Sequence, residues 1–417
     1  MWGLDQAIAN SARQAEEISR AFEEQRKAER QHRERLEEGA TSSIEGCRMT
    51  GIGYCEAGQI QALAQLHPED EFLLQFFSRK DEHIKIERLA PYLRDNMKPH
   101  WAKASGYVYR LVSNFLPVSY RHFFGDRAQV THFFNYIVPP NVAGKKIVTV
   151  HDMVYKTFPE TVRGRTKYML ETGLKKSMKR ADRIVTDSEF SKQEIIRYFP
   201  QFADKIRVVY CGVDQERFHP VTDAAAIAAV KEKFSIGGDY FLYLGTLEPR
   251  KNLERLMEAY AQFANGKHNP PRLVLAGGKG WLDSGIYETV HQLHLEKEVL
   301  FTEYVPDADI CALMCGALAF VFPSIYEGFG MPPLEAMACG VPVLTTHAAS
   351  LPEVVGEDAV VVDPYQVDAI AGGLERLYTD AALREKLKKA GPLRAAKFTW
   401  EASAKQLYAV YQEVCGE

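Results

Sequence analysis

The sequence has no long apolar run, no excess of one charge and no paired-cysteine motif. The longest uncharged run of note, Ile310–Tyr326, contains Gly316 and Pro323 and is too short to cross a bilayer comfortably, so we expect no transmembrane helix. Lys and Arg number 51 against 55 Asp and Glu, and the net charge of −4 excludes a globally basic nucleic-acid-binding protein. The N-terminus soon becomes densely charged instead of apolar, so we expect no signal peptide.

Cysteine is scarce, and no two cysteines form a Cys-x-x-Cys pair. Seven cysteines, an odd number in a large chain, are typical of reduced and mostly buried thiols in a cytoplasmic protein. Cys311 and Cys315 are spaced to share one helix face, and we interpret them as core packing instead of a metal pair. The sequence also has no Walker-type phosphate loop, no His-Glu-x-x-His and no Gly-x-Ser-x-Gly, so it lacks the motifs of P-loop enzymes, zinc proteases and serine hydrolases.

What the sequence does contain is the composition of an ordinary globular protein. A chain of 417 residues with 46% hydrophobic and 25% charged residues predicts two or three folded domains. Residues 1–40 differ from the rest, because apolar residues recur there at helical spacing among dense charges of both signs. This segment predicts a long charged helix, which is either a solvated appendage or a surface for self-association.

Beyond Thr50, short apolar runs alternate with amphipathic stretches in two series. The predicted strands are Glu71–Phe77, Val130–Phe134, Lys146–Val150, Arg183–Thr186, Arg207–Tyr210, Tyr240–Leu244, Arg272–Ala276, Val299–Phe301, Ala319–Phe322, Val341–Thr345 and Ala359–Val362. This alternation predicts an α/β fold with two doubly wound parallel-sheet domains. We expect an N-terminal domain over residues 41–218, a C-terminal domain over 219–398 and a helix over 399–417 that packs back on the N-terminal domain. Because ligands bind at the carboxyl ends of parallel strands, functional motifs should directly follow strands.

The most informative segment, Phe322–Leu344, reads as a strand end, a glycine-rich turn, a helix and another strand. Gly328 and Gly330 allow the backbone to approach a ligand closely, and the helix start offers N–H groups to an anion. We expect Glu335 in the first helical turn, where a carboxylate can accept hydrogen bonds from the hydroxyls of a ribose or a sugar. The alternative interpretation is a generic tight turn with an acidic residue at a helix start.

Two basic residues, Arg250 and Lys251, follow the predicted strand Tyr240–Leu244 beside a helix start. Cations held at a rigid strand end can neutralise a diphosphate with little reorganisation. Taken alone, adjacent basic residues are more often part of a solvated surface.

Two weaker motifs lie in the N-terminal half. His151 and Asp152 directly follow a predicted strand, where they form either a functional site or a structural hydrogen-bonded pair. Gly51 and Gly53 precede a predicted helix and could cradle a sugar or a phosphate, although two glycines at this spacing are common in turns.

Together these segments resemble the retaining glycosyltransferases of group 1, family 4, from about Thr50 to the C-terminus. The matching segments are, in order, Thr50–Tyr54, Val148–Asp152, Ala181–Ser191, Val209–Asp214, Tyr243–Leu253, Leu275–Gly278 and Glu327–Gly340. The resemblance implies the GT-B fold, in which two Rossmann-like domains face a cleft. The run Gly-Thr-Leu-Glu-Pro-Arg-Lys-Asn is most similar to bacterial mannosyltransferases of polysaccharide and O-antigen assembly.

The resemblance also implies roles for individual residues. Glu327 would contact the hydroxyls of the donor sugar, and Glu335 would hold the ribose. Lys251 matches the diphosphate-binding lysine of the family, and Arg250 would add a second positive charge there. His151 matches a histidine placed near the donor hexose. The implied catalytic set is therefore His151, Glu327, Lys251 and Arg250.

Further positions would bind the donor through their backbone or by apolar contact. The implied set is Gly328, Phe329, Gly330, Gly51, Gly53 and Val305. The glycine-rich turn would lie near the sugar and diphosphate, the N-terminal glycine loop would close over the diphosphate, and Val305 would lie beside the nucleobase.

Two departures from the family pattern stand out. Thr246 occupies a position where the family commonly has an arginine, and Arg250 is the candidate to supply that charge. Family members also normally begin with an apolar strand before the glycine loop, whereas Thr41–Met49 has few apolar residues. We therefore expect the first strand to be missing or degraded. Either the N-terminal half is remodelled, or the recorded start of the chain is aberrant. In the second case the protein would be impaired.

The sequence thus predicts a retaining hexosyltransferase that moves a sugar, with GDP-mannose the preferred donor, to a hydroxyl of a glycan or lipid-linked acceptor. We expect no metal and no other cofactor, because Arg250 and Lys251 can supply the positive charge. The alternatives are a nucleotide-sugar epimerase or glycan phosphorylase of the same fold, or a catalytically silent assembly subunit. We expect a cytoplasmic protein without a nucleic-acid partner. The basic segment Arg163–Arg183 and the aromatic stretch Tyr107–Phe124 favour peripheral contact with the inner face of the cytoplasmic membrane.

Overall fold

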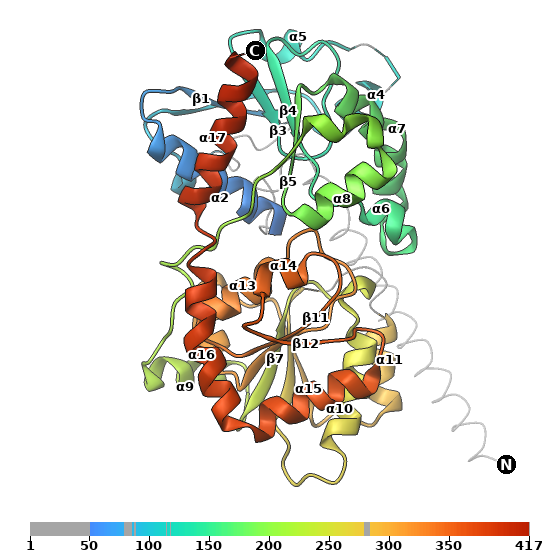
Figure 1. Cartoon of the computed structure of the whole chain (residues 1–417), viewed down its shortest axis with the longest axis vertical. Coiled ribbons are helices and arrows are strands. Elements are labelled where there is room, and N and C mark those ends of the chain that lie inside the picture. Colours follow the sequence, from blue (N-terminus) through green and yellow to red (C-terminus); the bar gives the residue numbers. More distant parts are fainter. Residues whose placement is uncertain are drawn as a thin grey trace, which may run out of the picture.

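The computed structural model describes residues 51–78, 86, 89–113, 115–116, 118–278 and 284–416. These residues form two α/β domains, one above the other in Figure 1. The predicted charged helix over residues 1–40 and the segment 41–49, where a degraded first strand is expected, lie outside the described residues.

The N-terminal domain contains a four-stranded parallel sheet in the order β3-β4-β5-β6 and a separate two-stranded parallel sheet of β1 and β2. The strands are β1 Phe72–Phe77, β2 Met97–Ala102, β3 Val130–Phe133, β4 Lys145–Thr149, β5 Arg183–Thr186 and β6 Ile206–Val208. The helices are α2 Gly51–Leu66, α4 Gly106–Ser113, α5 Arg121–Phe124, α6 Val154–Thr157, α7 Gly164–Arg180 and α8 Glu189–Tyr198. Short 3₁₀ helices are η1 Ala90–Tyr92, η2 Pro159–Thr161 and η3 Pro200–Lys205.

The C-terminal domain contains one six-stranded parallel sheet in the order β12-β11-β10-β7-β8-β9. The strands are β7 Tyr240–Leu244, β8 Arg272–Ala276, β9 Val299–Glu303, β10 Ala319–Phe322, β11 Val343–Thr346 and β12 Val360–Val362. The helices are α9 Ala224–Lys233, α10 Leu253–Ala264, α11 Ser284–Gln292, α12 Asp307–Cys315, α13 Met331–Ala338, α14 Leu351–Val355, α15 Val367–Thr379 and α16 Ala381–Ala395, with the 3₁₀ helix η4 Pro249–Lys251.

The predicted strands are all present, with ends shifted by at most two residues. The fold class is therefore confirmed. One strand, β2, was not predicted, because its sequence Met-Lys-Pro-His-Trp-Ala has no apolar alternation and contains Pro99.

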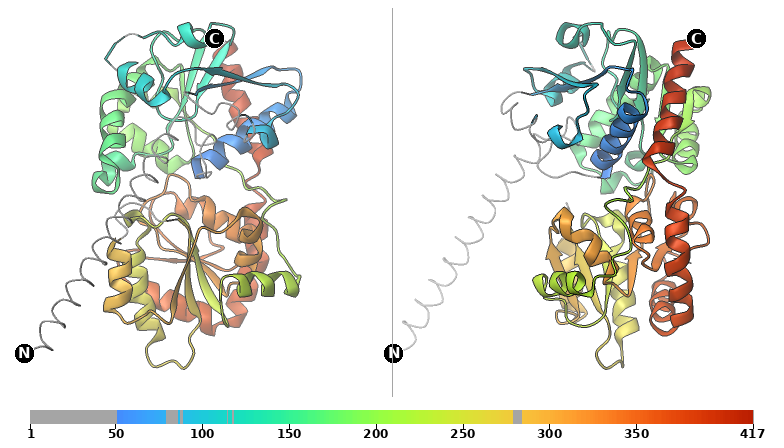
Figure 2. Two further views of the ribbon diagram at one scale, coloured as in Figure 1. Left: turned by 180° about the vertical axis from the view of Figure 1, so that it is seen from behind. Right: turned by 90° about the vertical axis from the view of Figure 1, so that its left-hand side faces the viewer.

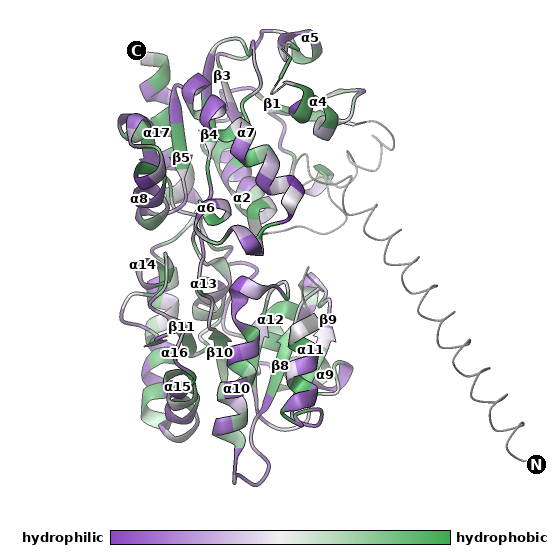
Figure 3. Cartoon of the chain, turned by 90° about the vertical axis from the view of Figure 1, so that its right-hand side faces the viewer, coloured by the Kyte–Doolittle hydropathy of each residue, from purple (hydrophilic) through white to green (hydrophobic). Residues whose placement is uncertain are grey.

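The apolar runs of the C-terminal strands are explained by their position. All four residues of β10 are buried, because helices cover both faces of a parallel sheet. Figure 3 shows the same division, with the strands mostly hydrophobic and the outer faces of the helices hydrophilic. This rigid sheet fixes the ends of β7 and β10, which carry the candidate site.

The last helix, α17 (Trp400–Gly416), returns to the N-terminal domain, as Figures 1 and 2 show. Its residues Leu407 and Val410 pack in one cluster with Leu63 of α2 and with the N-terminal sheet. Trp400 lies where the chain crosses over, and a Cβ atom at Gly58 would come within 2.3 Å of its ring. The indole therefore requires a glycine at that position of α2.

Candidate active site

The carboxyl ends of both sheets meet at one place, which we call the domain junction. From the N-terminal domain it contains the residues after β4 and β5, and from the C-terminal domain the residues after β7 and β10. Several hydrogen bonds cross it. For example, the backbone N–H of Met153 donates to the hydroxyl of Tyr326, 2.9 Å away.

Glu327 lies at the centre of the junction. It follows β10, and its carboxylate accepts hydrogen bonds from three groups within 3.0 Å. Lys251 Nζ is 2.6 Å from Oε1, Ser324 Oγ is 2.6 Å from the same atom, and an Arg250 guanidinium nitrogen is 3.0 Å from Oε2. The structure thus brings together three of the four residues that the resemblance implies to be catalytic.

The charges around Glu327 decide its protonation. Burial raises the pKa of a carboxyl, but here the nearby Lys251 and Arg250 outweigh burial and lower the pKa of Glu327 to about 2. For Lys251 the balance is reversed, since burial and the neighbouring Arg250 lower the pKa of its ammonium despite the attraction of Glu327. With a pKa of about 2, Glu327 is ionised throughout the neutral range.

Arg250 has further acidic neighbours. Its Nε lies 2.6 Å from Oε1 of Glu248, a buried residue that precedes η4. Burial lowers the pKa of the guanidinium, but Glu327, Glu248 and Asp152 together raise it, so Arg250 stays charged. The junction holds Arg250 by two carboxylates, which fixes its planar group in one orientation.

His151 is buried directly after β4 and uses both ring nitrogens. Nδ1 lies 2.7 Å from Oδ2 of Asp187 and Nε2 lies 2.8 Å from the carbonyl oxygen of Phe134. Because both partners are acceptors, both nitrogens carry hydrogen and the imidazole is cationic. Burial lowers the pKa of His151, but Asp187 outweighs it and raises the pKa to about 10. In this arrangement a contact with a hexose would require one of these bonds to break.

The glycine-rich turn lies against the N-terminal domain. A Cβ atom at Gly328 would come within 2.5 Å of the carbonyl oxygen of His151, so only glycine allows this approach. Ser188 Oγ donates to the carbonyl of Gly328 at 2.6 Å, and Ser191 Oγ lies 3.0 Å from the same oxygen. Gly330 adopts a positive φ of 105° as the N-cap of α13.

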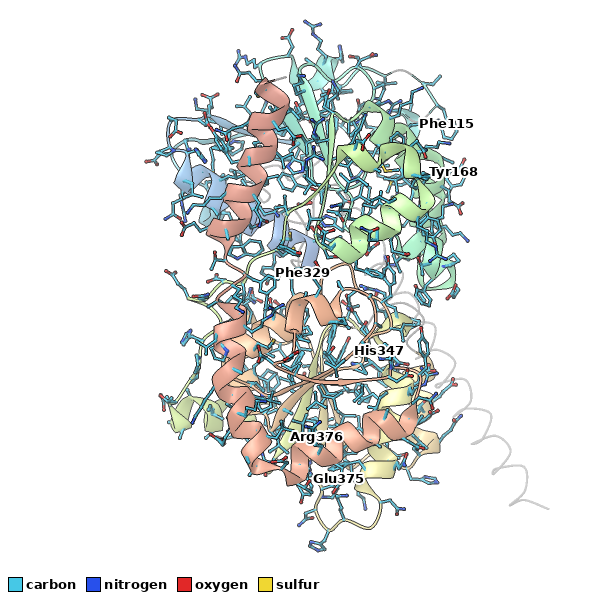
Figure 4. All side chains as sticks on the ribbon, viewed as in Figure 1. Phe115, Tyr168, Phe329, His347, Glu375 and Arg376 are labelled. Carbon is cyan, nitrogen blue, oxygen red and sulfur yellow. The ribbon has the colours of Figure 1, made fainter. Side chains whose placement is uncertain are left out.

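Phe329, at the centre of that turn, is labelled at the domain junction in Figure 4. It is buried, with its ring centroid 5.8 Å from that of Phe398 and 6.3 Å from that of Tyr210. Among the described residues, no partner is found for the backbone N–H groups of Phe329 and Gly330. These groups and the N-terminus of α13 are available to an anion.

Glu335 corrects one expectation from the sequence. Because α13 begins at Met331, Glu335 is its fifth residue and lies in the second turn, not the first. Burial raises its pKa most, Arg217 opposes this, and Asp307 and Asp214 add to it, so the pKa is about 7. No hydrogen bond to the Glu335 carboxylate is found within the described ranges.

The remaining implied donor positions fall in two places. Gly51 and Gly53 lie in the first turn of α2 instead of in a loop before it. Next to them, the hydroxyl of Tyr54 donates to Oδ2 of Asp307 in the C-terminal domain, 2.8 Å away. Val305 is buried after β9.

Sequence reasoning missed several groups of the junction. Arg217 forms an ion pair with Asp307 at 3.1 Å and influences Glu335. Asp187 directly follows β5, so the rule that motifs follow strands could have found it. The sequence did not single out Glu248, because its role depends on the ion pair that it forms with Arg250 in the folded protein.

Three thiols gather away from the junction. Cys311 and Cys315 of α12 pack against the C-terminal core that contains Cys339, which agrees with their interpretation as core residues. The three sulfur atoms lie within 4.8 Å of one another.

Comparisons with known proteins agree with this architecture. A family model described as "Glycosyl transferases group 1" matches residues 226–394, and one described as "Glycosyltransferase Family 4" matches residues 78–217. The O-antigen chain mannosyltransferase B of Escherichia coli is 36% identical over 284 residues, which cover 68% of this chain and 74% of that protein. The serotype-specific mannosyltransferase WbdA of Escherichia coli is 32% identical over 270 residues. That match covers 63% of this chain but 33% of WbdA, so this chain spans about a third of it.

Among solved structures, sucrose-phosphate synthase from Thermosynechococcus elongatus superimposes with a TM-score of 0.68. The match covers 92% of this chain and 97% of that chain at 22% identity. At this identity the likeness shows the two-domain fold alone.

Proposed function

This chain belongs to the group 1 glycosyltransferases of family 4, and from that membership we propose that it is a retaining mannosyltransferase that uses GDP-mannose. The acceptor would be a hydroxyl of a glycan or of a lipid-linked sugar. The identity with O-antigen chain mannosyltransferase B supports mannose as the transferred sugar. The GT-B arrangement of two domains supports a site at their junction.

One observation carries the proposal: a buried carboxylate, Glu327, is held ionised between two cations at the ends of β7 and β10. An ionised carboxylate can accept hydrogen bonds from the hydroxyls of a hexose. Lys251 and Arg250 can each donate to a diphosphate, which gains negative charge as its bond to the sugar breaks. On donor binding, these cations would exchange part of their contact with Glu327 for the diphosphate.

The glycine-rich turn completes the anion site. The N–H groups of Phe329 and Gly330 would donate to diphosphate oxygens, and the start of α13 would add its dipole. Glu335 would accept hydrogen bonds from the ribose. No metal is needed in this proposal, because protein cations and amides supply the stabilisation.

His151 would act as a positioning residue. Its ring is fixed by Asp187, and its carbonyl oxygen lies 3.0 Å from Ser191 Oγ, the hydroxyl that also approaches the carbonyl of Gly328. The charged imidazole thus holds the end of β4 where the glycine-rich turn of the other domain packs. Exclusion of water at this contact favours transfer over hydrolysis.

A lipid-linked acceptor is supported by one surface of the N-terminal domain. Phe115, Leu116 and Tyr168 are exposed by 60%, 59% and 51%, and Figure 4 shows Phe115 and Tyr168 on the same side of the molecule. Lys176 Nζ lies 5.5 Å from the ring of Phe115. We call this surface, together with Val108 and Arg165, the α4–α7 patch. Apolar and basic groups side by side suit the surface of an anionic membrane.

The aromatic stretch predicted to contact a membrane is only partly exposed. Tyr109, Tyr120 and Phe124 are buried in a core cluster with Phe77, so for them the membrane interpretation is wrong. Among the described helices, none is long and apolar enough to cross a bilayer. The proposed contact with the inner face of the cytoplasmic membrane is made by the α4–α7 patch.

The purified protein should be tested with GDP-mannose and UDP-glucose, with and without a mannose-terminated lipid-linked acceptor. The proposal expects release of GDP and growth of the acceptor only when GDP-mannose and acceptor are both present. NMR of the product should show the anomeric configuration of the donor. An altered nucleotide sugar without acceptor would indicate an epimerase, and transfer that requires inorganic phosphate would indicate a phosphorylase.

Substitutions at the candidate site should abolish transfer, whereas substitutions on the outside of the same domain should not. Glu327→Gln should abolish transfer, whereas Glu375→Gln, on the outside of the C-terminal domain, should leave it unchanged. If both variants fold and transfer equally, the junction is not the active site. If neither they nor the unmodified protein bind any nucleotide sugar, the silent-subunit alternative is correct.

A further inference from the structure

Three thiols lie together in the C-terminal domain, outside the candidate active site, and we call them the α12–α13 thiol cluster. Cys311 and Cys315 lie on α12, and Cys339 is the C-cap of α13; Figure 3 labels both helices. The three sulfur atoms all lie within 4.8 Å of one another, and Cys311 Sγ is 3.7 Å from Cys339 Sγ. The proposed sugar transfer does not use this cluster.

The local structure explains why the three side chains meet. Residues four apart on an α-helix lie on the same face, so Cys311 and Cys315 are neighbours on α12. The end of α13 packs against that helix, since Cys339 Sγ lies 4.0 Å from the sulfur of Met314, a buried residue of α12. Two helices therefore hold the cluster in place.

The separations of the sulfur atoms agree with those in a zinc site. In tetrahedral zinc sites each Zn–S bond is about 2.3 Å long, which places two sulfur ligands about 3.8 Å apart. The 3.7 Å between Cys311 and Cys339 is close to that value. Since all pairs lie within 4.8 Å, an adjustment of about 1 Å or less would bring the others to it.

A fourth ligand atom lies beside the sulfurs. The carbonyl oxygen of His219 is 3.2 Å from Cys311 Sγ and 3.5 Å from Cys315 Sγ, and both thiols donate to it. An oxygen ligand and a sulfur ligand of a tetrahedral zinc ion are about 3.6 Å apart. The carbonyl thus already faces the positive ends of two S–H groups, and a cation that replaces these hydrogens would keep it satisfied.

A backbone amide also favours a thiolate at this place. The N–H of Val221 donates to Cys315 Sγ, 3.3 Å away. A neutral thiol is a weak acceptor, whereas a hydrogen bond to a charged acceptor is stronger. Hydrogen bonds of this kind hold the ligands of metal sites in position and tune the metal.

The cluster is accessible as well as enclosed. Cys339 is buried, but Cys311 and Cys315 are only partly buried, so an ion can enter from solvent. The other pair of neighbouring thiols in the described part of the chain, Cys55 and Cys211, is fully buried with its sulfur atoms 3.0 Å apart. That separation is shorter than two zinc ligands require.

We propose that the α12–α13 thiol cluster binds Zn²⁺ through three thiolates and the carbonyl oxygen of His219. Three S–H bonds break and three Zn–S bonds form, so the three protons pass to solvent and the site carries one net negative charge. Nothing is oxidised or reduced. Thiolate ligands select zinc over Mg²⁺ and Ca²⁺, which prefer oxygen.

The ion would hold three segments together. His219 and Val221 belong to the segment that enters the C-terminal domain after β6, and the cysteines belong to α12 and α13. Helix α13 starts at the glycine-rich turn and ends at Cys339, so zinc at one end would stabilise the helix whose other end is proposed to bind the donor. This structural role does not depend on which sugar or nucleotide is bound.

Zinc titration of the full chain tests the proposal. The protein is stripped of metal, kept reduced with a phosphine instead of a thiol, and titrated with Zn²⁺ against a chromogenic chelator. We expect one tightly bound Zn²⁺ per chain. Cys311→Ser and Cys315→Ser should each weaken binding about a hundredfold or more, since loss of a residue that only supports a ligand already costs about 10–100-fold. Cys415→Ser, at an exposed cysteine outside the cluster, should leave binding unchanged.

Cys55→Ala controls for a different zinc site. The ligand atoms of Cys55, Cys211 and Asp187 also lie within 4.8 Å of one another. If Cys55→Ala loses the zinc and Cys311→Ser keeps it, the ion is bound there and the proposal is wrong. Absence of tight zinc binding by the unmodified, reduced protein would also overturn the proposal.

Co²⁺ gives a readout that does not depend on a variant. Bound in place of zinc, it should produce the near-ultraviolet charge-transfer absorption of a cobalt ion with thiolate ligands, and Zn²⁺ should displace it. Bound Co²⁺ without this absorption would contradict the assignment of the ligands.

Thermal unfolding adds a measurement of stability. Zn²⁺ should raise the melting temperature of the unmodified protein and of Cys415→Ser, but not that of Cys311→Ser, because a ligand that binds the folded state stabilises it. Circular dichroism checks that each variant is folded. An equal rise in all three proteins would show that zinc binds outside the cluster.

Discussion

Lys251 Nζ lies 2.6 Å from Oε1 of Glu327, and both side chains are buried. The two residues come from different strand ends, β7 and β10, that are neighbours in the sheet. A buried ion pair adds little stability when it is complete but costs several kcal/mol when one partner is removed. The pair is better explained by the diphosphate and hexose that it is proposed to bind.

Removal of the lysine charge should abolish most of the turnover. In Lys251→Ala we expect the turnover number to fall by about 10²–10³, the usual effect of deleting one group that stabilises transition-state charge. Steady-state kinetics with GDP-mannose measures it. Lys267→Ala removes a cation that pairs with Glu375 on the outside of the same domain, and should leave turnover unchanged. Equal losses in the two variants would show that the diphosphate site lies elsewhere.

Nucleotide affinity should depend on pH through Glu335. Its pKa of about 7 means that the carboxyl loses its proton in the neutral range, and the ionised form is the better acceptor for ribose hydroxyls. Binding of GDP, measured by calorimetry, should therefore strengthen as pH rises from 6 to 8. Glu335→Gln should remove this dependence. Glu335→Ala should weaken binding by about 1.5–3 kcal/mol, which is roughly ten- to a hundredfold.

A side chain at Gly328 should disrupt the packing of the glycine-rich turn against the N-terminal domain. The Cβ atom of Gly328→Ala would lie 2.5 Å from the backbone oxygen of His151, which cannot move aside cheaply. We expect faster proteolysis at the domain junction and a loss of transfer. Gly372→Ala is the control, because nothing lies within 4 Å of its added Cβ. Unchanged proteolysis and transfer in Gly328→Ala would contradict the packing described at the junction.

The pairing of His151 with Asp187 should make stability pH-dependent. The pKa of His151 rises from 6.5 to about 10 on folding, so its contribution is complete below pH 6.5 and is lost as pH rises towards 10. Thermal unfolding should show a lower melting temperature at pH 9.5 than at pH 7. In His151→Asn the difference between these pH values should shrink. A variant with the same pH dependence as the unmodified protein would show that another group is responsible.

Vesicle co-sedimentation tests the α4–α7 patch. Replacement of Phe115 and Leu116 by serine should reduce binding to anionic vesicles, and high salt should release the unmodified protein. The control is Leu393→Ser, since this leucine is 72% exposed but lies on α16 of the C-terminal domain. Equal binding to neutral and anionic vesicles, or none to either, would refute the membrane proposal.

Sequence alone predicted the frame of the molecule well. Strands such as β7 and β10 are continuous apolar runs bounded by turn residues, and their ends are those predicted. β2 escaped notice because its residues are exposed or half-buried along most of its length and carry no apolar pattern. The turn that Glu335 occupies was misplaced because Pro332 and Pro333 mark a helix start only to within a residue or two.

The sequence predicted the individual residues of the candidate site, but not the contacts between their side chains. Glu327 and Lys251 were both singled out, yet their mutual contact depends on the adjacency of β7 and β10, strands that are far apart in the sequence. Asp187 and Glu248 become important only because folding brings a buried imidazole and a guanidinium to them. Burial in three dimensions sets such pKa values, and no periodicity in the sequence encodes it.

The crossing of the chain between domains has a mechanical consequence. Within the described part of the chain, two segments connect the domains, one after β6 and one before α17, and the backbone N–H of Val213 donates to the carbonyl of Phe398 at 2.9 Å between them. Because these two connecting segments are hydrogen-bonded to each other, rotation of one domain about this point is the easiest relative movement. Sliding or separation of the domains would break the hydrogen bond between Val213 and Phe398. We therefore expect the two domains to open and close by a hinge rotation, with Trp400 at the hinge.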